Sequence, residues 1–179
     1  MKKLIAMTMG LILTLSLTGC GSAAPSAETA KATEVPETHS VQNMINPYWT
    51  CQDAAEMQQK AGFEVSLPEH LPQWVSETIY RTIPEELIEV IYAGEDNEIR
   101  VRIARGTVDI SGVYDSDASQ EKDVTVGENT VHLKGEPAAD GSLTVLVSTW
   151  TTAEGRTYSV TSTQGVAESS LTQLISQIR

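Results

Sequence analysis

The sequence predicts an α+β domain, in which a twisted, antiparallel β-meander sheet of about six to eight strands packs against two helices on one face. Three observations support this prediction. Apolar and polar residues alternate repeatedly between residues 75 and 163, as they do in strands with one buried face. Short turns separate these runs, and helical apolar patterns flank them at residues 50–62 and 166–179. Because a helix with one apolar stripe has to bury it, both helices are expected on the apolar sheet face.

Residues 1–19 have the layout of a signal peptide. Lys2 and Lys3 precede an uncharged apolar run from Leu4 to Leu17, which small residues follow. The run is shorter than the roughly 20 apolar residues that cross a bilayer as a helix, so a permanent membrane helix is the weaker interpretation. Cleavage is therefore expected, and the protein is predicted to act outside the cytoplasm.

The segment Leu17-Thr18-Gly19-Cys20 resembles the lipobox of bacterial lipoproteins, in which diacylglycerol alkylates the cysteine thiol before cleavage. The resemblance implies that Cys20 is lipidated, begins the mature chain and holds it on the extracytoplasmic face of the cell membrane. Two or three acyl chains, such as palmitate, would anchor the chain nearly permanently, at about 0.8 kcal/mol per buried methylene. The alternative is a plain secreted protein with a chance cysteine.

Residues 20–46 are predicted to form a flexible tether. They consist mainly of Ala, Ser, Thr, Glu and Pro, with Val35 and Val41 nearly alone as β-branched apolar residues. Such a segment buries too little surface to offset the entropy cost of ordering it. As a coil it would hold the domain on the order of 30 Å from the membrane. A single globular domain is expected at residues 47–179.

The chain is strongly acidic. Its formal charge is −12, and loss of Lys2 and Lys3 with the signal peptide would change this to −14. A nucleic-acid partner is not expected, because phosphate binding needs a basic surface. The same charge repels anionic lipid headgroups, so the lipid on Cys20 is expected to do the anchoring. With the Cys20 sulfur in a thioether, Cys51 has no intramolecular partner and the domain is expected to fold without a disulfide.

The first helix is expected just after Thr50. Thr50 with Asp53 three residues later resembles a capping box, and Gly62 is placed to end the helix in a left-handed conformation. Pro68 and Pro72 then break regular structure and turn the chain toward the first long strand.

That strand is predicted at residues 75–83, with Val75, Ile79 and Ile83 on one face and hydroxyl side chains on the other. The strongest hairpin prediction follows, with two β-rich runs around a loop at 94–97. This loop fixes three cross-strand pairs: Ala93 with Glu98, Ile91 with Arg100, and Glu89 with Arg102. The other face of the hairpin is expected to join the core through Ile88, Val90, Tyr92, Ile99, Val101 and Ile103.

Arginines are expected on the hairpin face that points away from the core. Arg100, Arg102 and Arg105 would there form an anion-binding site in an otherwise acidic protein. The alternative is a cross-strand ion pair on a solvated sheet face, which Glu89 opposite Arg102 favours. The residues alone leave both interpretations open.

Four further strands are predicted, and the short turns between them favour an antiparallel meander. They are expected at residues 124–126, 130–134, 143–151 and 156–163. A last helix closes the chain, with one apolar stripe at the spacing i, i+3, i+4, i+7. The stripe consists of Leu171, Leu174, Ile175 and Ile178.

Several stretches of residues 60–179 together resemble the extracytoplasmic bacterial domain known as domain of unknown function 4367. They include a Gly-Phe pair followed by Pro-x-x-Leu-Pro, here Gly62-Phe63 and 68–72, and a late hairpin with Trp150, Gly155 and Tyr158. This family occurs in membrane-anchored lipoproteins and at the outer ends of some anti-sigma regulators, mainly in Gram-positive bacteria. The resemblance implies the fold and location predicted above, but no activity and no catalytic residues.

Calcium is the only metal that the sequence hints at. Asp115, Asp117 and Ser119 take positions one, three and five of a calcium loop. Gln120 then replaces the glycine of that loop and Val126 replaces its closing glutamate, so calcium binding is a weak prediction. No cofactor is expected.

The sequence contains no recognisable catalytic set. It therefore favours a non-enzymatic, lipid-anchored binding or interaction module, whose partner is an envelope protein or a wall component. One alternative is a carrier or sensor of an apolar small molecule, for which Trp49, Trp74 and Trp150 are the candidates. The other is a cell-wall hydrolase with Asp115 and Glu121 as paired carboxylates, although an exposed loop lacks the desolvation that tunes a catalytic acid.

Overall fold

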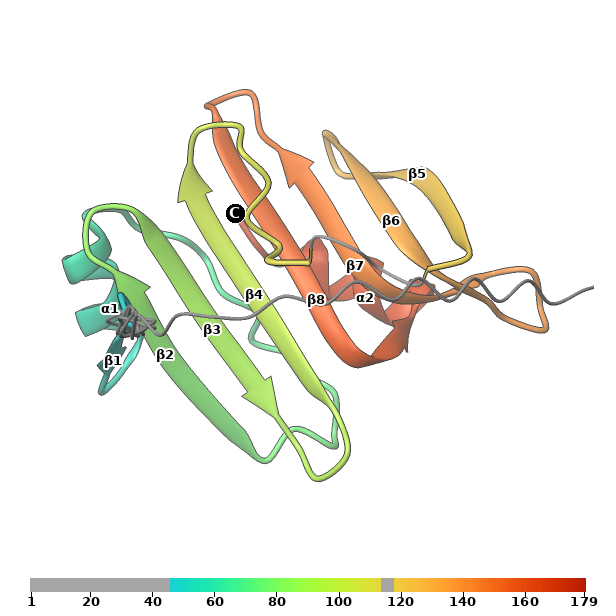
Figure 1. Ribbon diagram of the computed structural model, residues 1–179, viewed down its shortest axis with the longest axis horizontal. Helices are drawn as coiled ribbons and strands as arrows, with labels where there is room; N and C mark the ends of the chain where they lie inside the picture. The colour runs from blue at the N-terminus through green and yellow to red at the C-terminus, as the bar shows by residue number, and fades with distance from the viewer. Residues whose placement is uncertain (1–45, 114–117) are drawn as a thin grey trace, which may run out of the picture. The chain divides into compact units, whose positions relative to one another are not determined.

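The computed structural model describes residues 46–113 and 118–179 (Figure 1). The predicted signal peptide, nearly all of the predicted tether and Cys20 lie outside the described residues, and so do Asp115 and Asp117. The described part of the chain forms one eight-stranded antiparallel sheet and two helices, which confirms the predicted α+β class. Within it, no helix is both long and apolar enough to cross a membrane.

The sheet consists of two four-stranded meanders. The first contains β1 (Trp49–Cys51), β2 (Glu77–Ile83), β3 (Leu87–Ala93) and β4 (Glu98–Arg105). The second contains β5 (Gln120–Val126), β6 (Asn129–Pro137), β7 (Leu143–Thr151) and β8 (Arg156–Ala167). The strand order is β1-β2-β3-β4-β8-β7-β6-β5, so the meanders meet where β4 pairs with β8. β5 is therefore the outer strand of the second meander and is separated from β4 by β8, β7 and β6.

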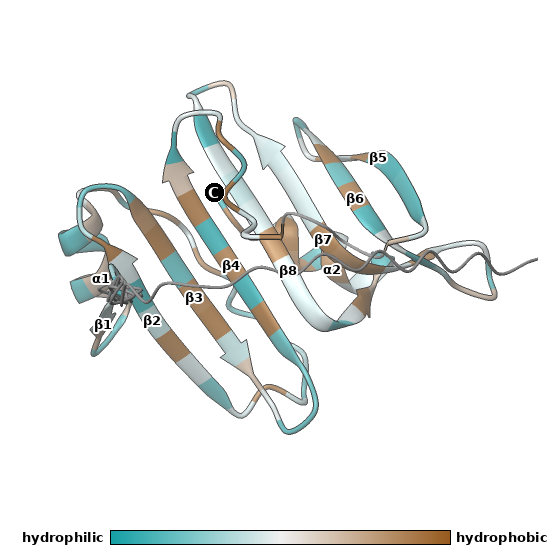
Figure 2. Ribbon diagram, viewed as in Figure 1, coloured by the Kyte–Doolittle hydropathy of each residue, from teal (hydrophilic) through white to brown (hydrophobic). Residues whose placement is uncertain are grey.

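The β3–β4 hairpin has the predicted register. Ala93 pairs with Glu98, Ile91 with Arg100 and Glu89 with Arg102. The Gly94 amide donates to the Asn97 carbonyl and closes the loop at 2.9 Å. Figure 2 shows hydrophobic and hydrophilic bands alternating along β3 and β4, and the six predicted core residues of this hairpin are all buried.

The alternation of apolar residues along β2 predicts the wrong buried face for this strand. Thr82 lies opposite Ile88 of the core and is fully buried, with its hydroxyl donating to the Leu87 carbonyl at 2.7 Å. Ile79 instead lies on the same face as Arg81, opposite the buried Ile91. The register with β3 decides which face is buried, and a threonine is accommodated because its hydroxyl finds a backbone acceptor.

Helix α1 (Ala54–Ala61) begins later than predicted. Its N-cap is Asp53, whose Oδ1 accepts from the Glu56 amide at 2.8 Å, while Glu56 accepts from the Gln52 amide at 2.7 Å. Thr50 cannot cap the helix because it belongs to β1, opposite Arg81. Gly62 ends the helix at φ 72°, as predicted.

Helix α2 (Glu168–Ile175) buries the predicted stripe. Leu171, Leu174 and Ile175 lie in the core, and Ile178 joins them from the turn after the helix. The carboxyl end of the chain is fixed by the Ser66 amide, which donates to the Arg179 carbonyl at 2.7 Å. In Figure 1 α2 lies behind β7 and β8, and α1 lies at the left edge beside β1 and β2, where Met57 and Ala61 join the same core. We call the sheet face toward the helices the core face and the opposite one the open face.

Candidate functional site

One residue from each strand lies in a single row across the open face. From β1 to β5 in spatial order, the paired residues are Thr50, Arg81, Glu89, Arg102, Ser159, Thr149, His132 and Asp123. Every member of the row is polar. The open face therefore presents polar and charged groups at positions that the strand register fixes.

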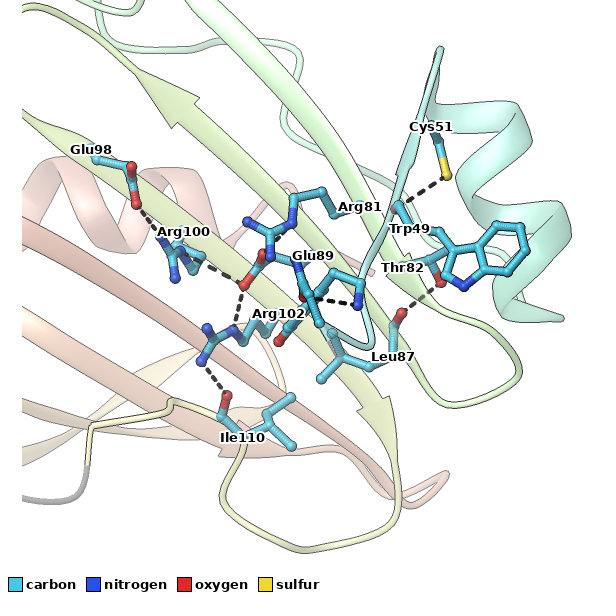
Figure 3. A network of polar contacts seen from close by, with 12 residues as sticks. Trp49, Cys51, Arg81, Thr82, Leu87, Glu89, Glu98, Arg100, Arg102 and Ile110 are labelled. Atoms are coloured by element: carbon cyan, nitrogen blue, oxygen red, sulfur yellow. Dashed lines mark hydrogen bonds and ion pairs between the residues drawn. The ribbon is translucent and has the colours of Figure 1, made fainter. Parts of the chain in front are cut away.

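Glu89 is the centre of the charged part of this row. Its side chain is fully buried, and Oε2 accepts from Arg102 Nε at 2.7 Å (Figure 3). Arg81 Nε lies 3.2 Å from Oε1, and Arg100 Nε lies 3.7 Å from Oε2. A buried carboxylate is costly unless it is paired. Here one carboxylate has three guanidinium groups around it.

The cluster holds more positive than negative charge. Glu98 adds a second carboxylate, with Oε1 2.7 Å from Arg100 Nη2. Three arginines thus face two carboxylates, in a protein whose formal charge is −12. Arg81 is further held by the ring of Tyr48, 4.3 Å from its guanidinium carbon.

Residues 106–113, which we call the strap, follow β4 and are tied to the open face by Arg102. Arg102 Nη1 donates to the carbonyls of Ile110, at 3.1 Å, and Ser111, at 2.6 Å. Gly112 has φ 69°, and a Cβ there would overlap Arg102 Nη1. Three of the five N–H donors of Arg102 therefore have protein acceptors, and only 12% of its side chain is exposed.

A hollow of about 370 Å³, the strap groove, lies between the strap and the strands β4, β8 and β7. Arg100, its carboxylate partner Glu98 and the threonines of β8 supply polar lining, and 32% of the Arg100 side chain is exposed. Apolar lining comes from β7 and the strap. The lining residues that matter below are Arg100, Thr161, Leu146, Val147 and Val113.

The predicted arginine set is partly wrong. Arg100 and Arg102 lie on the open face as expected, but Arg105 donates through Nη2 to the Gly62 carbonyl at 2.8 Å and stacks over Phe63 of the core. Side chains alternate along a strand, so a position three residues from Arg102 points the other way. Arg81 was missed. Pairing the predicted strand at 75–83 with residues 87–93 through a short turn places it opposite Glu89.

At the β5 edge, His132 lies between two carboxylates. Its Nδ1 is 2.8 Å from Asp123 Oδ1, and its Nε2 is 3.4 Å from Glu121 Oε2. A hydrogen bond from Lys134 lowers the pKa of Glu121. An exposed, paired carboxylate of this kind is poorly suited to act as a catalytic acid. Asp115, its partner in the hydrolase hypothesis, lies outside the described residues.

The three tryptophans do not form one cleft. Trp150 is buried and stacks on Tyr158 with ring centroids 4.9 Å apart. Trp49 lies on β1 with Lys60 over its ring. Trp74 is 38% exposed and lines a second hollow of about 440 Å³ beside α2. Apolar lining there comes also from Leu71.

Cys51 is a buried thiol with a raised pKa. Its Sγ lies 3.8 Å from the Trp49 carbonyl, and burial, reinforced by the charge of Glu56, raises its pKa. A raised pKa reduces the thiolate that a nucleophile needs. Cys51 therefore has a packing role.

In residues 46–113 and 118–179, no three His, Cys, Asp or Glu side chains are placed to hold a metal ion. No protein-family model, curated protein or solved structure matches the chain. The resemblance to domain of unknown function 4367 stays a prediction.

Proposed function

We propose that this protein is a lipid-anchored, extracytoplasmic binding module that holds an envelope partner or ligand against the open face of its sheet, without catalysis of its own. The signal peptide pattern and the lipobox-like segment ending at Cys20 support the location. The tether would let the domain reach beyond the headgroup layer.

The cluster around Glu89 is the observation that carries the proposal. Stability alone does not require a carboxylate buried among arginines. Well-packed apolar residues at the same positions often stabilise a fold equally well, without the cost of removing charges from water. The cluster does fix the position and direction of charged groups on a rigid face, and rigid, prearranged groups favour binding. The helices and the segment that contains Phe63 and Val65 pack on the core face, so the polar open face is the one available to a partner.

The test is position-dependent photocrosslinking in intact cells that produce the full-length protein. A photoreactive amino acid replaces Thr149 on the open face or, as the matched control, Gln59 on the exposed surface of α1. We expect one dominant adduct from position 149 and none from position 59. Identical adducts from both positions, or no adduct from either, would contradict the proposal.

The anchor is tested separately. Cys20→Ala should release the protein from the membrane fraction and abolish metabolic labelling with palmitate. Membrane association that survives this substitution would show that lipid on Cys20 is not the anchor.

A second candidate function is a carrier or sensor of an apolar small molecule, favoured by the hollow that Trp74 lines beside α2. Organic extraction of the purified full-length protein followed by mass spectrometry tests it. A bound lipid beyond the covalent anchor, reduced by Trp74→Ala, would support this candidate, and an empty extract would remove it.

A further inference from the structure

We propose that the strap groove binds a carboxylate attached to a short aliphatic group, with Arg100 contacting the charge. This inference rests on the proposed function and deepens it, because it names the chemistry that the open face recognises. The inference rests on two observations. The cluster around Arg100 has three arginines and only two carboxylates, and Arg100 lines a small, partly apolar hollow.

The three arginines of the cluster differ in how firmly they are held. Arg102 is the closest to Glu89 and also donates to two strap carbonyls. Arg100 Nε is buried, lies 3.7 Å from Glu89 Oε2 and has no hydrogen-bond partner among the described residues, so only the Nη groups can meet a ligand. Its one short contact is Nη2 to Glu98, whose side chain is itself 32% exposed. A ligand carboxylate can therefore replace Glu98 on Arg100.

The groove offers a second polar group beside Arg100. Thr161 of β8 lies directly opposite Arg100 in the sheet register, and both line the hollow. A guanidinium fork and a neighbouring hydroxyl supply donors from two sides of a bound anion. Carboxylates match the planar geometry of the fork and accept two parallel hydrogen bonds from it.

The walls beside these donors are apolar. The register of β7 shifts between Val145 and Val147, and Leu146 and Val147 both line the groove, with Val113 of the strap as a further wall. The hollow is about 370 Å³, near the lower end of small-molecule sites, which span roughly 300–1,000 Å³. A short aliphatic chain next to the charge fits these dimensions.

Direct titration of the isotope-labelled, full-length protein in detergent tests the site. The probes are sodium pentanoate, sodium acetate and sodium phosphate, at an ionic strength held constant with sodium chloride, and the readout is the NMR signals of the arginine Nε–Hε groups. We expect the Arg100 signal to saturate at a lower concentration of pentanoate than of acetate or phosphate. Shifts that chloride reproduces, or a preference for phosphate, would overturn the inference.

Two substitutions should act in opposite directions. Arg100→Gln should weaken pentanoate binding by about tenfold or more, since it removes a charge-assisted hydrogen bond. Because this variant lacks the Arg100 signal, its binding is followed through the backbone amide signal of Thr161, which lines the groove. Glu98→Gln removes the competing carboxylate and should tighten binding, by about threefold. Arg156→Gln is the matched control, because this half-buried arginine donates to the Glu64 carbonyl away from the groove. Unchanged affinity in Arg100→Gln, in a protein whose other signals are unmoved, defeats the proposal.

The source of the carboxylate is resolved with two further probes. Acetylvaline represents the end of a peptide, and its amide is the uncharged control. Tighter binding of acetylvaline than of pentanoate identifies a peptide carboxyl end, and the reverse order identifies a free acid. If neither acid binds while position 149 still gives its adduct in cells, the carboxylate inference is wrong and the proposed function stands.

Discussion

Glu89 and Arg102 lie directly opposite each other on β3 and β4, with Arg102 Nε 2.7 Å from Glu89 Oε2. The pair links the sheet to the strap, because the same guanidinium donates to the carbonyls of Ile110 and Ser111. The buried carboxylate of Glu89 thus orients the arginine that holds the strap, the segment that follows β4.

Glu89→Gln should destabilise the domain by about 3 kcal/mol, because it leaves three guanidinium groups around a neutral side chain. Chemical denaturation of the full-length protein in detergent measures this. Glu98→Gln is the control, since Glu98 is partly exposed and belongs to a surface pair worth about 1 kcal/mol or less. Equal losses of unfolding free energy in the two variants would mean that the buried Glu89 contributes no more to stability than an exposed ion pair does.

Trp150→Ala should cost about 3–5 kcal/mol of unfolding free energy, because it empties a large core position and removes the stack on Tyr158. Trp49→Ala removes the same side chain where it is 57% exposed, and should cost less than about 1 kcal/mol. Thermal and denaturant unfolding compare the two. A similar cost for both substitutions would contradict the packing described here.

Two glycines should respond differently to replacement by alanine. At Gly135 a Cβ would overlap the Thr144 carbonyl on the neighbouring strand, so Gly135→Ala should cost about 2–3 kcal/mol. Gly127 has φ 61° in an open turn, so Gly127→Ala should cost only about 1 kcal/mol, from backbone strain. Denaturant unfolding of both variants measures the two losses in unfolding free energy. An equal or larger loss in Gly127→Ala would contradict the close approach of β6 and β7 at Gly135.

Acid should weaken the contact between β5 and α2. A hydrogen bond from Lys122, at 2.6 Å, lowers the pKa of Glu168 below its ordinary 4.5, despite partial burial. A carboxylate with a lowered folded-state pKa stabilises the fold fully at pH values above 4.5, and this stabilisation is lost as the pH falls through the folded-state pKa. Lys122→Gln should therefore flatten the decline in unfolding free energy between neutral and acidic pH.

The control for this titration is Lys60→Gln, which removes a lysine on α1 far from Glu168 in sequence. Its pH profile should run parallel to that of the unmodified protein. If both lysine variants flatten the profile to the same extent, general charge is responsible and the Lys122–Glu168 contact is not.

Thiol titration should distinguish the two cysteines. Burial and a raised pKa protect Cys51, so it should react with a disulfide reagent slowly in the folded protein and rapidly in guanidinium chloride. The acylated chain should then titrate as one thiol and the Cys20→Ala variant also as one, because Cys51 is the thiol in both. Two reactive thiols in the mature protein would show that Cys20 carries no lipid.

The sequence was sufficient for much of the fold. The loop at 94–97 set the hairpin register, and the spacing of Leu171, Leu174 and Ile175 identified the buried side of the last helix. The position of β8 could not be predicted. Short turns indicate which strands are sequential neighbours, but the pairing of β4 with β8 depends on packing between segments far apart in the chain.

The candidate site was predicted in part. Alternation along β4 put Arg100 and Arg102 on the open face, and the pair with Glu89 followed from the register. Arg81 could be found only by pairing β2 with β3, and the strap contacts are made by backbone carbonyls of Ile110 and Ser111, which no side-chain pattern reveals. The strap groove arises from that backbone path, so it had no signal in the sequence.

The pairing of β4 with β8, which we call the seam, also affects how fast the chain folds. Hairpins within each meander close over short loops and carry a small entropic cost, whereas the seam joins residues as distant as Val101 and Val160. Non-local contacts of this kind slow folding. We therefore expect each meander to form early and the docking of β8 on β4 to limit the rate, so that the unpaired edge of β4 is the surface most exposed to misassociation before β8 docks.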